Sequence, residues 1–552
     1  TNQSLFYGGW FVYFLNLIFL IMKNILSALL ILFAINAYTQ IPAIVWQKCY
    51  GSPEDDWSYG IVSKGDGLLI AIHLRDSIPG ITNYHGMGDI WIINTDSTGN
   101  IIWEKCFGGS KGDIPWKLIK KSEDEFFIFG ITASTDGDVQ SGNNGYFDLW
   151  VVKINGQGDI QWEKTYGCIG DDDPRDMILT PDGGFVMIDR IGIGGGDVTH
   201  FYGVGDCWMA KCDSLGNIEW EKTLGNDGLD NCNSLIINSA GNIMMIGGAQ
   251  KHGGLVECYP DGAWVDVWIV ELDMQGNILA QYCYGGSHYD LGYMIIELNE
   301  GYAFIGFTYS NDGDVSGLHG HPGDKGDIWV VRLNEQMEII WQKCIGGGYT
   351  DFPSYIAQTE DEGFVVFGTT FSNDGDVSGN PSWPGINSAI WVVKLDSQGS
   401  IEWQKVYGGW GLELLKNPHT VLKKSNYNYI FAASTDSSPS YDVQCKPFIE
   451  QNAWIFEIAL PDTTNIFTPP VGAGEVRVYP NPTTTELWLQ LSDNIPPVQA
   501  QIELYSHTGR LLYKAQPTGH FHKIDVTHLP SGLYLVRLWD GERWRTEKVV
   551  VE

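Results

Sequence analysis

Basic residues are scarce in this chain, in which 33 lysine and arginine residues stand against 67 aspartate and glutamate residues. The resulting net charge of −34 at pH 7 repels nucleic acid and anionic membranes, so we expect no nucleic-acid partner. A surface this acidic serves solubility first, and it also suits divalent cations or basic partners.

Cysteine is sparse as well, and 10 residues in 552 are too few for a disulfide scaffold. Four cysteines recur at equivalent positions about 60 residues or more apart, and such equivalent sites in different repeats would lie too far apart to bond to one another. They are Cys49, Cys106, Cys283 and Cys344. Other cysteines could pair in an oxidising compartment, with a connectivity that the sequence leaves open. These include Cys207, Cys212, Cys232 and Cys258.

Familiar catalytic motifs are missing from the sequence. It has no phosphate-binding glycine loop, no paired Ser/His/Asp arrangement and no zinc-type cysteine spacing. Carboxylate pairs of the glycosidase kind could still be present among so many aspartates. We therefore assign no catalytic residue and no residue that binds an organic cofactor.

The N-terminus carries an apolar stretch with the organisation of a targeting segment. Met22 begins a short positive region, and an apolar run of signal-peptide length follows at 25–37. We predict an upstream extension at residues 1–21 and a signal peptide at 22–40. The alternative is a single membrane anchor over residues 10–37.

One motif recurs seven times at intervals of 57 to 62 residues. In most copies it is a Trp followed by a polar residue and Lys. This repetition determines the fold. The copies are centred on Trp46, Trp103, Trp162, Trp220, Ala280 (a degenerate copy), Trp341 and Trp403. A second series of Trp precedes or follows these copies, one in each repeat: Trp91, Trp150, Trp208, Trp268, Trp329, Trp391 and Trp454. A turn separates the two series, Asp396-Ser-Gln-Gly399 in one copy and Asp213-Ser-Leu-Gly216 in another, which indicates a hairpin.

A second hairpin precedes the first in each repeat, so each repeat predicts four strands, A to D. Four strands per repeat of about 60 residues are typical of a propeller blade. We assign both Trp series to core packing between blades rather than to a ligand cage. The last repeat has a C strand at 454–458 and no D strand, whereas residues 44–50 form a D strand with no A to C before it. We therefore predict that the N-terminal strand completes the last blade, which removes two open sheet edges.

The predicted fold is all-β: a seven-bladed β-propeller over residues 41–460, a linker at 461–475 and a small β-sandwich at 476–552. The turn Asp96-Ser-Thr-Gly99 before Trp103 resembles the repeats of Trp-rich quinoprotein propellers. The turn is one residue shorter than in that family, and no adjacent cysteine pair is present. The resemblance supports a propeller packed by Trp and not a quinone site.

The segment 476–552 resembles the type A sorting domain of type IX secretion cargo in Bacteroidota. Its motifs occur in order along short strands, and the residues that carry the resemblance are Pro480, Asn481, Pro482, Gly509, Gly532, Tyr534 and Lys548. The resemblance implies the type IX machinery as a partner and export through the periplasm. It also implies removal of the tail, with the protein then released or attached at the outer-membrane surface.

Long, variable loops between the B and C strands mark the face where function is expected. They lie at 75–89, 132–148, 190–206, 249–266, 308–327, 370–389 and 434–453. Three of them carry an Asp-Gly-Asp pattern, formed by Asp136 and Asp138, Asp312 and Asp314, and Asp374 and Asp376. Such carboxylates can bind Ca²⁺, or they can accept N–H groups in tight turns. The sequence thus offers calcium as a candidate cofactor.

Histidines also occur on these loops. His319, His321 and Asp324 cluster on one loop and could hold a transition metal, while solvated loop histidines are the simpler interpretation. His85, His200 and His252 occupy other loops of the same face.

Three functions fit the sequence. The first is a secreted or surface-bound monomeric module that binds a glycan, a protein or a surface polymer through the B–C loops. The second is an extracellular polysaccharide hydrolase or lyase with carboxylates in the propeller funnel. The third is a purely structural surface protein.

Overall fold

The computed structural model divides the chain into two compact units, Gln40–Asp462 and a unit that includes Thr463–Glu552. In the first unit it describes residues 42–81, 83–250, 253–257, 264–445 and 451–460. In the second it describes 476–479, 486–491, 500–506, 510–517, 521–527, 529–530, 532–539 and 544–551. The predicted upstream extension, signal peptide and linker lie outside these residues. In these ranges, no helix is long and apolar enough to span a membrane.

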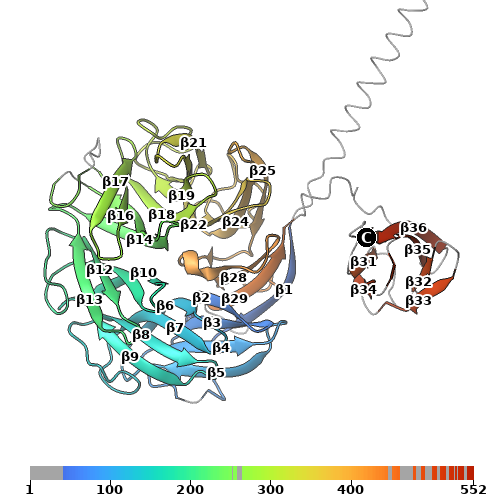
Figure 1. The fold of residues 1–552 in the computed structure, drawn as a ribbon, viewed down its shortest axis with the longest axis horizontal. Coiled ribbons are helices and arrows are strands. Elements are labelled where there is room, and N and C mark those ends of the chain that lie inside the picture. The colour runs from blue at the N-terminus through green and yellow to red at the C-terminus, as the bar shows by residue number, and fades with distance from the viewer. Residues whose placement is uncertain are drawn as a thin grey trace, which may run out of the picture. The chain divides into compact units, whose positions relative to one another are not determined.

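Seven antiparallel sheets surround a central axis as the blades of a propeller, with the first strand of each blade nearest the axis (Figure 1). Blade 1 contains β2 (Trp57–Lys64), β3 (Gly67–Leu74), β4 (Asp89–Thr95) and β5 (Ile101–Phe107). Blade 2 contains β6 (Asp113–Lys120), β7 (Glu125–Thr132), β8 (Asp148–Asn155) and β9 (Ile160–Tyr166). Blade 3 contains β10 (Asp172–Leu179), β11 (Phe185–Ile191), β12 (Asp206–Cys212) and β13 (Ile218–Leu224).

The next three blades repeat this order. Blade 4 contains β14 (Asp230–Ile237), β15 (Ile243–Ala249), β16 (Asp266–Leu272) and β17 (Ile278–Tyr284). Blade 5 contains β18 (Asp290–Glu297), β19 (Tyr302–Thr308), β20 (Asp327–Leu333) and β21 (Ile339–Ile345). Blade 6 contains β22 (Asp351–Gln358), β23 (Phe364–Thr370), β24 (Ala389–Leu395) and β25 (Ile401–Tyr407). The degenerate copy is in register, since Ala280 pairs with Glu271 as Trp220 pairs with Lys211.

Blade 7 joins the two ends of the propeller, which confirms the predicted closure. It contains β26 (Glu413–Leu414), β27 (Val421–Lys423), β28 (Asn428–Thr435), β29 (Asn452–Ala459) and the N-terminal β1 (Ala43–Tyr50). Strand β1 runs antiparallel to β29, from Ala43 opposite Ala459 to Tyr50 opposite Ala453. A disulfide between Cys49 and Cys445 adds a covalent link between β1 and the B–C loop of the same blade.

The inner strand of blade 7 departs from the expected four-strand pattern. A short 3-10 helix, η1 (Pro418–Thr420), interrupts it between β26 and β27. Pro418 has no backbone N–H to offer a neighbouring strand, and the Asn417 side chain accepts a hydrogen bond from the His419 N–H at 2.9 Å. The strand therefore breaks, and η1 lies near the axis (Figure 1).

A hydrogen bond from the C-strand Trp to the D strand recurs in all seven blades. Each indole Nε1–H donates to a Glu or Gln carbonyl or carboxylate oxygen at 2.8–3.1 Å. In blade 7 the donor is Trp454 and the acceptor is Gln47 of the N-terminal strand. All seven Trp are fully buried, which confirms the core assignment of this series.

In five blades, the D-strand Trp packs against the glycine of the C–D turn of the next blade. Gly158, for example, has φ +76°, and a Cβ placed there would lie 2.8 Å from Trp103 Cη2. Gly216 faces Trp162 and Gly399 faces Trp341 in the same way. Glycine is required at each of these turns for two reasons. The backbone is left-handed there, and the indole ring leaves no room for a Cβ.

Most other cysteines do not pair as the sequence allowed. Cys207, Cys212 and Cys232 are free thiols, and each is buried. Cys106 and Cys344, at the repeat position of Cys49, are also free and buried. Cys258 lies outside the described residues.

The C-terminal unit is a β-sandwich, as predicted. One sheet has the order β30 (Val476–Tyr479), β31 (Glu486–Leu491), β34 (Phe521–Asp525), and the other has the order β33 (Leu511–Ala515), β32 (Gln501–Ser506), β35 (Gly532–Trp539), β36 (Trp544–Val551). Both sheets contribute to one apolar core, which includes Leu489, Ile502 and Val536. Tyr534 is buried and donates its hydroxyl to the Pro530 carbonyl at 2.6 Å.

The remaining residues of the sorting motif fall at strand ends or outside the described part. Gly532 begins β35, and the Lys548 backbone pairs with Leu535. Pro480, Asn481, Pro482 and Gly509 lie outside the described residues.

Gly158→Ala should lower the free energy of unfolding by about 3 kcal/mol, because it combines left-handed strain with a collision against Trp103. Gly241→Ala is the matched control. Gly241 has φ +83° with nothing within 4 Å of an added Cβ, so it should cost only about 1 kcal/mol. Denaturant unfolding of both variants measures the difference, and equal losses would show that the Trp contact contributes nothing.

Candidate functional site: the loop face of the propeller

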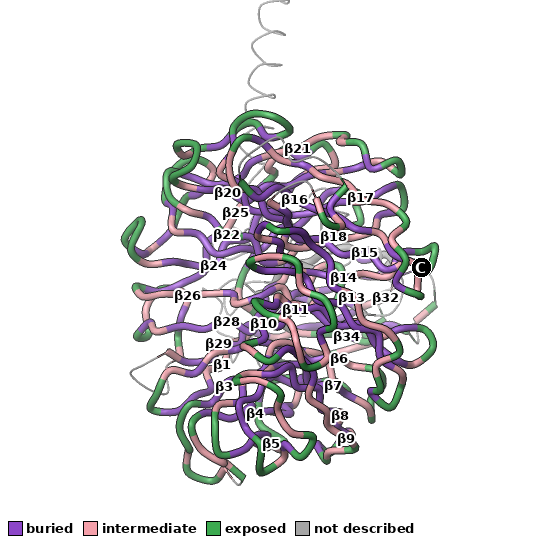
Figure 2. Tube along the Cα trace, turned by 90° about the vertical axis from the view of Figure 1, so that its left-hand side faces the viewer, coloured by how far each residue is buried: buried purple, intermediate pink, exposed green. Residues whose placement is uncertain are grey.

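The B–C loops and the D–A connections gather at one end of the strands and form the loop face. In blade 2, the Asp138 N–H of the B–C loop donates to the Gly108 carbonyl of the preceding D–A connection at 2.8 Å. The Asp376 N–H contacts Gly346 in the same way in blade 6, also at 2.8 Å. Figure 2 shows the exposed segments concentrated on the loops and the buried segments along the strands.

Every large aromatic side chain that the structure describes as exposed lies on this face. They are Tyr146, Tyr202, Trp264, Tyr349, Phe352, Trp383, Trp410 and Tyr441. The exposed apolar residues at the D-strand starts and C–D turns are all aliphatic: Ile101, Ile102, Leu215, Leu279 and Ile340. The exposed aromatic side chains are thus confined to one end of the propeller, where they contact solvent.

A ring of buried carboxylates supports the loop face. One stands at or just before the start of the inner strand of each blade: Asp56, Asp113, Asp172, Asp230, Asp290, Asp351 and Glu413. Each accepts a hydrogen bond from the backbone N–H four residues earlier. Asp290 also accepts from the Ser310 hydroxyl at 2.8 Å and from the Thr308 hydroxyl. These contacts fix the D–A connection against the end of the B strand.

Burial raises the pKa of these carboxyl groups, and local hydrogen bonds reduce the effect. Desolvation raises the pKa of Asp290 from 3.8 to about 6 and that of Asp351 from 3.8 to about 7. A second buried set begins the C strands of several blades. Desolvation also raises the pKa of two of its members, Asp89 and Asp327.

The loop histidines contact these carboxylates rather than one another. His319 Nδ1 lies 2.7 Å from Asp327 and its Nε2 lies 3.4 Å from Asp376 in the next blade. His85 Nδ1 lies 2.9 Å from Asp89. Both nitrogens of His319 therefore face carboxylates, and the side chain bridges blades 5 and 6.

The predicted transition-metal cluster is not assembled. The Asp324 N–H donates to the His321 carbonyl at 3.1 Å, and both side chains are exposed. Within the ranges given above, no group of three or more His, Cys, Asp or Glu residues could hold a metal ion. His200 is exposed and contacts Thr199 at 2.8 Å, while His252 lies outside the described residues.

The Asp-Gly-Asp loops are placed in three different blades, and their aspartates contact backbone N–H groups. The first carboxylates, Asp136, Asp312 and Asp374, accept from N–H groups of the preceding D–A connections at 2.7 Å. The third residues, Asp138 and Asp314, accept from Gly108 and Gly285 at 3.3 and 3.2 Å. Asp376 faces His319. Calcium binding by these loops stays a prediction.

The funnel along the axis contains a salt-bridged cluster that sequence reasoning missed. Lys117 Nζ lies 2.6 Å from Asp176 Oδ1, and His419 Nε2 lies 3.4 Å from the same oxygen. The Asn417 side chain donates across the axis to the Trp116 carbonyl at 2.9 Å. The sequence signal that could have indicated the break in the inner strand of blade 7, which brings Asn417 and His419 to the axis, was Pro418 within an expected strand.

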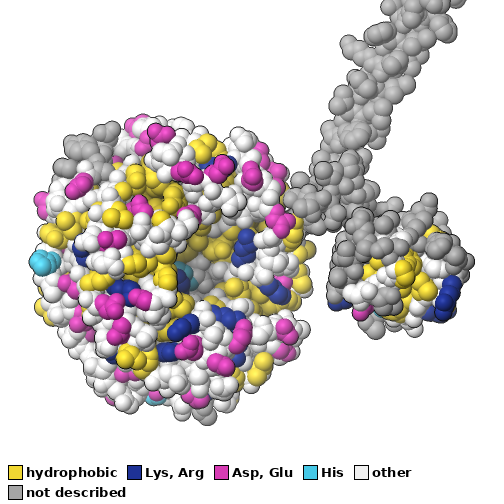
Figure 3. Space-filling view, in the orientation of Figure 1, with side chains coloured by type: hydrophobic (Ala, Val, Ile, Leu, Met, Phe, Trp, Pro, Cys, Tyr) yellow, Lys and Arg dark blue, Asp and Glu magenta, His cyan; other side chains and the backbone are white. Residues whose placement is uncertain are grey.

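The other carboxylates near the axis are also engaged. Asp173 is paired with Arg175, and Arg190 lies 3.9 Å from it. Asp172 and Asp189 share a hydrogen bond, and burial raises the pKa of both. Figure 3 shows a central hollow bordered by hydrophobic, basic and histidine side chains. In the described part of the funnel, these carboxylates are salt-bridged or buried.

The stability of the propeller should rise as the pH falls from about 8 to about 5. The pKa of such a carboxyl group is higher in the folded state than in the unfolded state, where it is about 4. Its contribution to stability is therefore complete below about pH 4, and it is lost as the pH rises through the folded-state pKa. Relief of the net negative charge acts in the same direction. Thermal melts across this range measure the effect. Asp290→Asn should flatten the profile, the exposed control Asp171→Asn should leave it unchanged, and a melting temperature that rises with pH would contradict the account.

Comparison with known families finds that the family of secretion system C-terminal sorting domains matches residues 477–552. No curated protein matches the sequence. This match coincides with the β-sandwich and with the segment that resembles type IX cargo tails.

Several solved structures share limited similarity with the chain. PorZ, a surface component of the type IX secretion system of Porphyromonas gingivalis, is 10% identical over 89% of this chain and 75% of its own, with a TM-score of 0.20. Apocarotenoid oxygenase of Synechocystis is 12% identical over 64% and 71%, with a TM-score of 0.33. Prolyl oligopeptidase B of Galerina marginata is 8% identical over 80% and 56%, with a TM-score of 0.37. Scores this low leave function to be argued from the residues of this chain.

Proposed function

We propose that the propeller is a binding module at the cell surface or in the medium, where the sorting domain matched at residues 477–552 directs the chain. The observation that carries the proposal is the confinement of exposed aromatic side chains to the loop face. Exposed aromatic groups of this kind mark ligand or partner sites, because their desolvation on contact favours binding.

The loop face is also held rigidly, as binding surfaces require. The Trp–Glu/Gln hydrogen bonds continue outward to the loops, since Glu163 accepts from both the Trp150 indole at 2.9 Å and the Ser141 hydroxyl of the B–C loop at 2.8 Å. Gln342 and Gln404 donate to Ser316 and Ser378 in the same way. A site that is ordered before binding loses less entropy when the ligand arrives.

The second candidate, a polysaccharide hydrolase in the funnel, needs two accessible carboxylates about 5–10 Å apart. Asp176 is paired with Lys117, Asp173 is paired with Arg175, and Asp189 is fully buried. These contacts support the binding module over the hydrolase.

Binding of the labelled full-length protein to intact cells and to their extracted surface polymers tests the proposal. A variant with Tyr146, Tyr202, Trp264, Trp383, Trp410 and Tyr441 all replaced by Ala should bind at least about tenfold more weakly. The matched control replaces Ile102, Leu215, Leu279 and Ile340 by Ser and should bind like the wild type.

Equal binding by the aromatic variant would overturn the proposal. Release of reducing ends from the polymers by the wild-type protein would instead favour the hydrolase. Thermal melts of each variant separate loss of binding from loss of folding.

A further inference from the structure

Three exposed aromatic side chains lie on the loops at the junction of blades 6 and 7, and a fourth lies on the other side of the blade 6 loop. Trp383 and Trp410 are 75% and 66% exposed, and Tyr441 is 59% exposed. The Trp410 and Tyr441 rings meet edge to face with centroids 6.1 Å apart. Tyr349 lies beside the same B–C loop as Trp383, because a Cβ on Gly385 would collide with the Tyr349 ring.

Hydrogen bonds lock this patch to the scaffold. The Ser382 hydroxyl donates to the Gly409 carbonyl at 3.0 Å, and the Asn387 side chain donates to the Trp410 carbonyl at 2.6 Å. Tyr441 has φ +48°, a left-handed conformation that costs energy for a residue with a side chain. The fold therefore holds a large ring in solvent at the expense of backbone strain.

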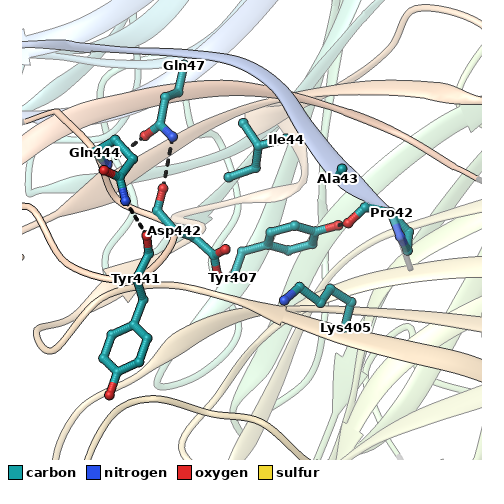
Figure 4. A pocket seen from close by; sticks show the side chains of 9 residues that line it. All are labelled: Pro42, Ala43, Ile44, Gln47, Lys405, Tyr407, Tyr441, Asp442 and Gln444. Atoms are coloured by element: carbon teal, nitrogen blue, oxygen red, sulfur yellow. Dashed lines mark hydrogen bonds between the residues drawn. The ribbon is translucent and has the colours of Figure 1, made fainter. Parts of the chain in front are cut away.

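A cavity of about 400 Å³ with a mixed polar and apolar lining lies next to Tyr441 (Figure 4). It is lined by Pro42, Ala43, Ile44, Gln47, Lys405, Tyr407, Tyr441, Asp442 and Gln444. Its wall is well ordered, since Gln47 donates to the Asp442 carbonyl at 2.9 Å and accepts from the Gln444 N–H at 3.0 Å.

The cavity lies at the one blade whose D strand comes from the N-terminus. In blades 1 and 2 the D-strand Lys reaches the residue after the turn glycine of the next blade. Lys105 thus pairs with Asp159 at 2.7 Å, and Lys164 donates to Asn217 at 2.7 Å. At the junction, the equivalent position is Ala43, so Lys405 faces the cavity without this partner.

We propose that a polysaccharide binds at this junction, an inference that rests on the proposed function. The site, called the seam site, is formed by Trp383, Trp410, Tyr441 and the cavity with Lys405. A sugar ring presents C–H groups on its faces and hydroxyl groups on its edge. Flat exposed rings fit the faces, while the Lys405 ammonium and the Asp442 and Gln444 side chains supply a donor and acceptors for the hydroxyls. Two or more sugars can occupy the aromatic rings while one enters the cavity.

Affinity electrophoresis of the full chain, in native gels that contain soluble xylan, laminarin or polygalacturonate, tests the seam site. At least one of these polysaccharides should retard the wild-type protein. Trp410→Ala/Tyr441→Ala should weaken that retardation at least about tenfold, and Lys405→Met should weaken it about threefold. The matched control is Leu215→Ser, a 64% exposed aliphatic residue in the C–D turn of blade 3, which should migrate like the wild type.

Each outcome separates the seam site from the general proposal. Retardation that survives Trp410→Ala/Tyr441→Ala but is lost in Trp264→Ala would overturn the seam site and leave a binding module on the loop face. Absence of retardation by all three polysaccharides would overturn the polysaccharide assignment, while binding to cells by the loop-face aromatics would then indicate a protein partner. Equal melting temperatures of the variants and the wild type exclude misfolding as the cause.

Discussion

The pairing of β1 with β29 closes the propeller, and the arrangement of the loop face depends on it. Without β1, blade 7 would lack its outer strand, and Trp454 would lack the Gln47 side chain that accepts its indole hydrogen. The same Gln47 holds Asp442 and Gln444 of the B–C loop. Ring closure and loop order at this junction therefore rest on one side chain from the N-terminal strand.

The other six blades use the same chemistry with local residues. A buried indole donates to the D strand, the D strand holds the B–C loop, and a buried carboxylate holds the D–A connection. Buried polar groups such as these stabilise a structure only when they are paired. Because these polar groups are paired here, the loops can expose large aromatic rings and still keep their position. Rigid loops with exposed aromatic rings favour ligand binding on the loop face over catalysis in the funnel.

Much of the fold could be predicted from the sequence, because repetition at about 60 residues and two Trp series leave few alternatives to a propeller. The N-terminal closure followed from counting strands. The break at Pro418 was missed because the repeat suggested a regular inner strand. The seam patch was missed as well, although Trp383 and Trp410 belong to neither Trp series, because only the fold brings them beside Tyr441. The loop histidines were predicted by type, but the contact of His319 with Asp376 of the next blade needed the three-dimensional structure.

Peptide mapping of the exported protein under non-reducing conditions tests ring closure most directly. The account predicts a cross-linked pair of peptides that contain Cys49 and Cys445, which are 396 residues apart in the sequence. Cys106, at the same repeat position in blade 1, should be recovered as a free thiol. Recovery of Cys49 as a free thiol, or bonded to a cysteine of another blade, would contradict the closure of the propeller by its N-terminal strand.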